Sequence, residues 1–160
     1  MKKVTGIVLG LLVAVSSYAS AMDFQIFDMR NKIFEESKAI KVKLAHSQDA
    51  VVLINLFDSC LITMSQLDAY FSMLGIFDTI KKEDLSSAAI NYIIVWLNEI
   101  TRANASNIKN FKAIAPQVGE DTNAHIAKVT KLLETLNTII VAENNKLNII
   151  LRALQTKAKK

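Results

Sequence analysis

Residues that break helices are almost absent from this chain of 160 residues. The 139 residues that follow residue 21 contain only three strong breakers, Gly75, Pro116 and Gly119. β-Sandwiches and barrels need a turn about every 8–12 residues, and such turns usually contain Gly, Pro or Asn-Gly. The hydrophobic fraction of 51% is too high for a disordered chain. These features together predict a compact all-α domain.

Residues 1–21 have the features of a secretory signal peptide. Lys2 and Lys3 precede an apolar stretch of about 12 residues, which is shorter than the roughly 20 needed to span a bilayer. Small residues follow and end at Ala21. We therefore expect cleavage near Ala21, a secreted or periplasmic location, and one mature domain over residues 22–160.

Removing this leader changes the charge of the protein. Lys2 and Lys3 leave with it, so the 19 basic residues of the whole chain fall to 17 against 15 acidic ones, and the net charge falls from +4 to +2. A balance this close to neutral gives no argument for nucleic acid as a partner.

Four segments have apolar residues at helical spacing, at about 23–45, 49–74, 80–114 and 122–157. The second is the most regular, because its apolar positions alternate steps of four and three, as in helices packed nearly antiparallel. Those positions are Leu53, Phe57, Cys60, Met64, Leu67, Phe71 and Leu74.

The connections between these segments are short, so neighbouring helices must run in opposite directions. The expected fold is an antiparallel four-helix up-down bundle with coiled-coil-like seams, in which helices three and four are longer. Gly75 is expected to end the second helix by adopting the left-handed conformation.

Motifs that carry catalysis are missing. There is no glycine-rich phosphate loop, no Gly-x-Ser-x-Gly and no His-Glu-x-x-His. We therefore expect a protein that is not an enzyme and has no cofactor. His46 and His125 are the candidate ligands for a metal or haem, since both are expected at one end of the bundle. The alternative is that both are solvated loop residues.

Two residues on the helix seams invite structural hypotheses. Cys60 is expected to be a buried free thiol, and the alternative is an intermolecular disulfide. Glu143 stands at an apolar position, where we expect it to pair with Arg30 and fix the helix register. The alternatives are that Glu143 is exposed because the fourth helix outruns the bundle, or that it is a functional carboxylate.

Asparagine recurs at every third residue in the third segment, at Asn104, Asn107 and Asn110. We expect these amides to form a solvated face, or else a strip that binds a partner. The leading functional hypothesis is an exported, non-enzymatic bundle that binds proteins or its own copies, as an envelope accessory, chaperone-like or inhibitor-like factor. The runner-up is a bundle that binds lipid or another apolar ligand. Binding of haem or metal is third.

Overall fold

The computed structural model describes residues 24–79 and 87–157, which form helices joined by short turns. A first helix occupies residues 24–44. It is followed by α2 (Ala50–Thr79), α3 (Ser87–Ile114), the short 3-10 helix η1 (Ala115–Gln117) and α4 (Glu120–Lys157). The expected signal peptide and the expected start of the third helix at residue 80 lie outside the described residues.

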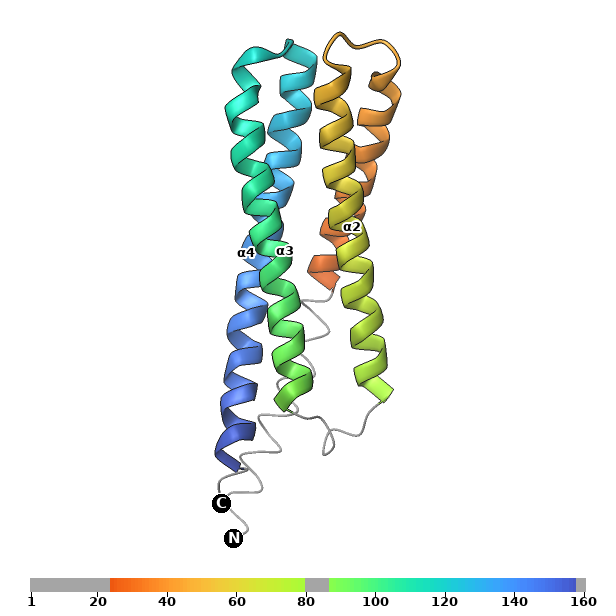
Figure 1. Ribbon diagram of the computed structural model, residues 1–160. Coiled ribbons are helices and arrows are strands. Elements are labelled where there is room, and N and C mark those ends of the chain that lie inside the picture. Colours follow the sequence, from red (N-terminus) through yellow and green to blue (C-terminus); the bar gives the residue numbers. More distant parts are fainter. Residues whose placement is uncertain (1–23, 80–86, 158–160) are drawn as a thin grey trace.

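The helices stand side by side as two hairpins, one made of the first helix and α2 and the other of α3 and α4 (Figure 1). Neighbouring helices run in opposite directions (Figure 1), and ion pairs join them. Arg30 of the first helix reaches Asp68 of α2, and Lys112 near the end of α3 reaches Glu134 in α4. The expected all-α fold of four helices with antiparallel neighbours is confirmed, and α4 is the longest described helix at 38 residues.

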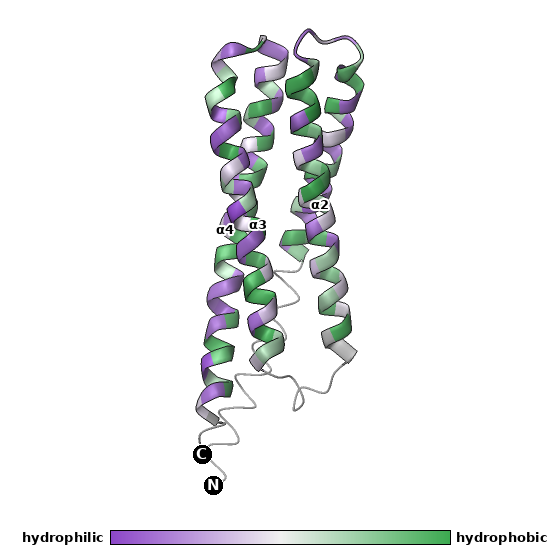
Figure 2. Ribbon diagram, viewed as in Figure 1, coloured by the Kyte–Doolittle hydropathy of each residue, from purple (hydrophilic) through white to green (hydrophobic). Residues whose placement is uncertain are grey.

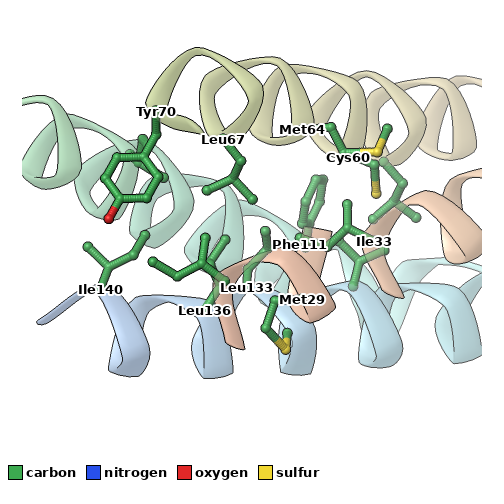
Figure 3. Close-up of a cluster of buried hydrophobic side chains, with 14 of the residues drawn as sticks. Met29, Ile33, Cys60, Met64, Leu67, Tyr70, Phe111, Leu133, Leu136 and Ile140 are labelled. Carbon is green, nitrogen blue, oxygen red and sulfur yellow. The ribbon is translucent and has the colours of Figure 1, made fainter. Parts of the chain in front are cut away.

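The core lies along the axis of the bundle and is filled by side chains from all four helices (Figure 3). On α2 the seam expected from the sequence faces inward, since Leu53, Cys60, Met64 and Leu67 are all buried. The other three seam residues of α2 pack against this core as partly buried side chains. On α4 the side chains of Val129, Leu133, Leu136 and Ile140 are buried in the same core.

The end of α2 differs from the expectation. The helix does not stop at Gly75 but continues to Thr79. Within the described residues no glycine has a positive φ, so Gly75 is an ordinary helical residue and not a left-handed cap. Apolar residues follow Gly75 directly, and a helix that buries its side chains tolerates one glycine at modest cost.

Candidate functional site

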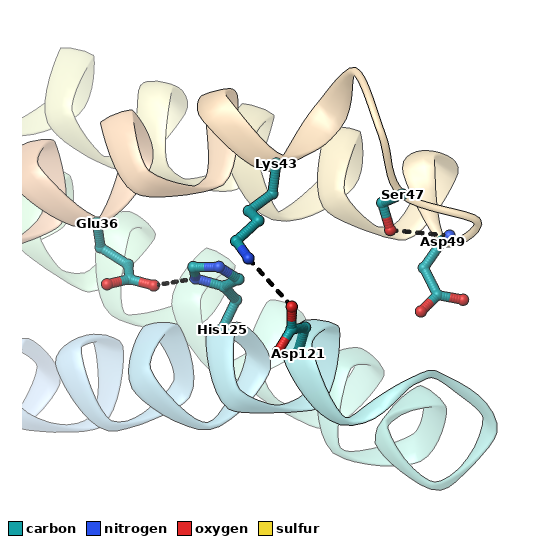
Figure 4. A network of polar contacts seen from close by, with 6 residues as sticks. All are labelled: Glu36, Lys43, Ser47, Asp49, Asp121 and His125. Carbon is teal, nitrogen blue, oxygen red and sulfur yellow. Dashed lines mark hydrogen bonds and ion pairs between the residues drawn. The ribbon is translucent and has the colours of Figure 1, made fainter.

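A polar cluster lies near the end of the bundle where both hairpins turn (Figure 4). Nδ1 of His125 on α4 is 2.5 Å from Oε1 of Glu36 on the first helix, and both side chains are about 90% buried. Lys128 lies 3.9 Å from the other carboxylate oxygen of Glu36. Lys43 and Asp121 add an exposed ion pair at 3.0 Å. The cluster therefore ties the first helix to the start of α4.

The two turns at this end are joined directly. Oδ2 of Asp49, in the turn before α2, accepts a hydrogen bond of 2.9 Å from the backbone N–H of Gly119. Ser47 Oγ in turn accepts from the backbone N–H of Asp49 at 3.0 Å, which holds the first turn in shape. The N–H of Gly119 is thereby satisfied by a residue 70 positions away.

His46 and His125 both line one shallow depression of about 480 Å³ beside these turns. The two imidazoles do lie at the same end of the bundle, as the topology required. His125, however, is engaged with Glu36, and His46 is exposed in its turn. Across residues 24–79 and 87–157, no group of three or more His, Cys, Asp or Glu side chains is arranged to hold a metal ion.

Glu36 belongs to this cluster although the sequence reasoning missed it. The signal was present, because Glu36 lies between Ile33 and Ile40, which are both buried on the inner face of the first helix. A charged residue in such a position needs a partner from another element, since burial of an unpaired charge is costly. His125 is that partner.

Arg30 pairs with Asp68 and not with Glu143, so the expected register pair is wrong. Its guanidinium donates to both carboxylate oxygens of Asp68, at 2.9 and 3.0 Å, and this contact raises the pKa of Arg30. Glu143 is buried, which also contradicts the alternative of an exposed carboxylate.

The error has a simple geometric cause. A pair between Glu143 and Arg30 requires His125 to be level with His46, but His125 is level with Glu36, ten residues earlier. Residues of the first helix from Met29 to Glu36 share a groove with Lys128 to Thr135 of α4. Arg30 is therefore level with α4 near Thr135, and Glu143 lies about two turns farther along α4.

The asparagine strip on α3 points largely inward, which corrects the expectation of a solvated face. Asn104 is fully buried. Its Oδ1 accepts from Thr63 on α2 at 3.2 Å, and its Nδ2 donates to Asn137 on α4 at 3.0 Å. Asn137 donates onward to the carbonyl of Thr101. These four residues form an amide cluster that joins three helices.

The other two residues of the strip lie progressively nearer to solvent. Asn107 is half-buried and donates to Ser59 on α2 at 2.8 Å, whereas Asn110 is exposed. The strip therefore turns gradually out of the bundle as α3 proceeds. Its spacing of three residues explains this, because a step of three falls short of one full helical turn.

Cys60 is a free thiol that is 1% exposed on the inner seam of α2. Burial, with a smaller contribution from the nearby charge of Glu36, raises the pKa of Cys60 to about 12. A thiol in this state is protonated at neutral pH and cannot reach a second chain. The position favours the buried-thiol hypothesis over the intermolecular disulfide.

Exposed apolar residues gather on the first hairpin (residues 24–79). Figure 2 shows hydrophobic residues around much of α2, whereas hydrophilic residues interrupt α4 repeatedly. Of the thirteen large hydrophobic side chains that are exposed in the described residues, nine belong to this hairpin. The most exposed are Val42, Val51 and Phe24, at 75%, 72% and 71%. We call this set the apolar surface of the first hairpin.

Comparisons of this chain with protein-family models, with curated proteins and with solved structures give no match.

Proposed function

We propose that this protein is an exported, non-enzymatic helical bundle that acts by binding other proteins, as an envelope accessory, chaperone-like or inhibitor-like factor. The observation that carries this proposal is the uneven distribution of exposed apolar side chains, nine of which lie on the first hairpin and four on the second. Exposed apolar side chains that gather on one part of a domain are a common mark of an interaction site.

The first helix contributes aromatic residues to this surface. Phe34 is 42% exposed, and the cationic groups of Arg30 and Lys38 lie 5.9 and 5.0 Å from its ring centre. Phe27 is 49% exposed and contacts Phe71 of α2 edge to face. Aromatic side chains with cationic neighbours are enriched where proteins bind each other.

The proposal is tested by affinity capture from an envelope extract of the source cells. We expect the purified protein to retain a defined set of proteins, and a Phe24→Lys/Phe34→Lys variant to lose them. The matched control is Val141→Lys, which places a cation at a residue of α4 that is 49% exposed. Equal capture by all three proteins, or capture by none of them, would contradict the proposal.

Membrane association is the second candidate, and one observation favours it. Residues Ala50–Ile76 of α2 form a helical stretch of 27 residues with a mean hydropathy of 1.6, long and apolar enough to cross a bilayer. Core helices of soluble bundles meet the same criterion, and the most apolar part of this helix is 39% buried. Flotation with liposomes distinguishes the candidates, since only a membrane-binding protein rises with the vesicles.

A further inference from the structure

A groove between α2 and α3 is lined by polar side chains from both helices. It has a volume of about 280 Å³, and we call it the α2–α3 groove. Two residues of the asparagine strip and three residues of α2 form its polar lining: Asn107, Asn110, Asn55, Asp58 and Ser59. Ser59 is buried and accepts a hydrogen bond of 2.8 Å from Nδ2 of Asn107. This bond holds the two walls of the groove together.

Asp58 is the only charged residue among the described side chains that line this groove. Its carboxylate is exposed and makes no ion pair or hydrogen bond in the part of the chain that the structure describes. The side-chain amides of Asn55 and Asn110 also make none there. By contrast, Asp68 on the same helix is held by Arg30. The α2–α3 groove therefore presents a negative charge and carbonyl oxygens that can accept further hydrogen bonds.

Apolar side chains form the rest of the lining: Val52, Ile62, Phe111 and Ile114. Phe111 is buried in the core, whereas Ile62 is exposed at the edge of the groove. A ligand that suits both parts of the lining has a cationic head with several hydrogen-bond donors and a short apolar stem. The side chain of arginine has this form, because its guanidinium carries N–H donors in a planar fork and its methylene groups pack on apolar surface.

We propose that the α2–α3 groove binds an arginine side chain of a partner protein, with the guanidinium at Asp58 and the methylene stem beside Ile62. The carbonyl oxygens of Asn107 and Asn110 accept hydrogen bonds from N–H groups that Asp58 does not engage. This inference rests on the proposed function, because it assigns the groove to a protein partner. It goes further by naming the chemical group through which that partner is recognised.

The size and the charge of the groove favour this ligand over others. Sites for small molecules usually have volumes of about 300–1,000 Å³, so a groove of about 280 Å³ suits one side chain better than a haem or a lipid. A single carboxylate is a weak ligand set for calcium, whose sites combine several charged and neutral oxygen ligands. Lysine fits less well than arginine, because its ammonium is a point charge whereas the acceptors are spread over two helices.

An NMR titration of the isotope-labelled protein tests the site directly. The probe is N-acetyl-arginine amide, and the matched probe is N-acetyl-citrulline amide, which has nearly the same shape but no charge. We expect the arginine compound to shift backbone amides in residues 52–62 and 107–114, with a dissociation constant in the millimolar range. The citrulline compound should bind at least about threefold more weakly, because it cannot form an ion pair with Asp58.

A pair of variants then assigns the binding to Asp58. Asp58→Asn removes the charge at nearly constant size, and we expect it to raise the dissociation constant of the arginine compound by about threefold to tenfold. The matched control, Glu120→Gln, removes one negative charge from an exposed residue that does not line the groove, and it should leave the dissociation constant unchanged. Unchanged amide signals elsewhere in the spectrum show that both variants are folded.

Equal binding of the two compounds, or equal binding by Asp58→Asn and the unmodified protein, would overturn the proposal. Shifts of the same amides by calcium chloride and not by the arginine compound would also overturn it, because they would assign the oxygen atoms to a metal ion. If arginine shifts no amide of the groove while capture that depends on Phe24 and Phe34 persists, only this inference is lost. If capture fails while arginine binds at Asp58, the proposed function is lost and the guanidinium site remains.

Discussion

Asn104 has the lowest exposure of the buried polar side chains in the described residues. Its amide can both accept and donate, so one side chain satisfies Thr63 on α2 and Asn137 on α4 together. Leucine would fill the same space but leave both partners without this contact. A buried asparagine of this kind is known to fix the register of packed helices.

We expect Asn104→Leu to lower the free energy of unfolding by about 1–3 kcal/mol, because the side chains of Thr63 and Asn137 lose their hydrogen bonds to Asn104. Asn110→Leu is the matched control on the same helix, and it should change the free energy by no more than about 0.5 kcal/mol, since Asn110 is exposed. Urea unfolding followed by circular dichroism measures both. Equal effects at the two positions would contradict an interior role for the amide cluster.

Cys60 should be inert in the folded protein. At pH 9 roughly half of the thiols in an unfolded chain are ionised, but a pKa of about 12 keeps Cys60 protonated in the bundle. We expect iodoacetamide to modify it only slowly at pH 9 and rapidly after unfolding in guanidinium. Mass spectrometry measures the modification, and a thiol-dependent dimer on a non-reducing gel would contradict the prediction.

The raised pKa of Cys60 also makes the stability of the protein depend on pH in the alkaline range. Because the pKa of Cys60 is higher in the folded state than its ordinary value of 9.0, the unfolded chain loses its thiol proton first as the pH rises. The contribution of the protonated thiol to stability is therefore fully present below pH 9 and falls as the pH rises from 9 toward 12.

At the level of single helices, Gly75 offers a clean test of the boundary of α2. A Cβ atom added at Gly75 would meet nothing within 4 Å, and its backbone is helical without a positive φ. Gly75→Ala should therefore raise the free energy of unfolding by about 0.5–1 kcal/mol, the usual gain inside a helix.

Gly119→Ala is the matched comparison, because there a Cβ would lie 3.3 Å from the Asp49 oxygen that accepts the Gly119 N–H bond. We expect this change to give no gain or a loss of stability. Thermal melting of both variants provides the measurement. A destabilised Gly75→Ala variant would mean that the helix does end at this glycine.

The sequence predicted which face of each helix is buried better than it predicted which side chains meet between helices. On α2 one line of positions at steps of four and three is apolar without interruption, so the local pattern of apolar residues determined the inward face. Asn104 was expected in solvent because an amide every third residue looks the same on an outer or an inner face. The distinction depends on Thr63 and Asn137, which lie 41 and 33 residues away.

Helix levels were hard to predict for a related reason. Hydrophobic periodicity indicates which face of a helix points inward, but it does not report how far one antiparallel helix is displaced along another. Here the offset of ten residues placed Glu36, and not His46, beside His125. The same displacement puts Glu143 out of reach of Arg30. The position of the first helix along α4 therefore decided both expected pairs, His46 with His125 and Arg30 with Glu143.

At the scale of the whole molecule, the contacts among α2, α3 and α4 are unequal. α3 and α4 pack against each other much more closely than either packs against α2. An ion pair between Lys112 and Glu134 and a hydrogen bond from Asn144 to Asn98 both cross their shared interface. Such a close interface between neighbours in sequence should open at a higher free energy than the contacts that α2 makes with α3 and α4.

We expect native-state hydrogen exchange to show its slowest amides in the middle of α3 and α4, and faster exchange along α2. The physical reason is that α2 can separate from the second hairpin at a lower free energy than α3 can separate from α4. Mass spectrometry of peptic fragments resolves the helices. Slowest exchange in α2 would contradict this order of stabilities.

The short chain between Thr79 and Ser87 is the sole covalent link between the two hairpins, each of which is continuous in sequence. The protein can therefore be regarded as two fragments that are held together by side chains from both sides of the core, such as Leu67 and Leu136. Cutting the chain in this link would turn an intramolecular docking step into a bimolecular one. The halves should complement each other when they are produced together, and their association would then depend on concentration.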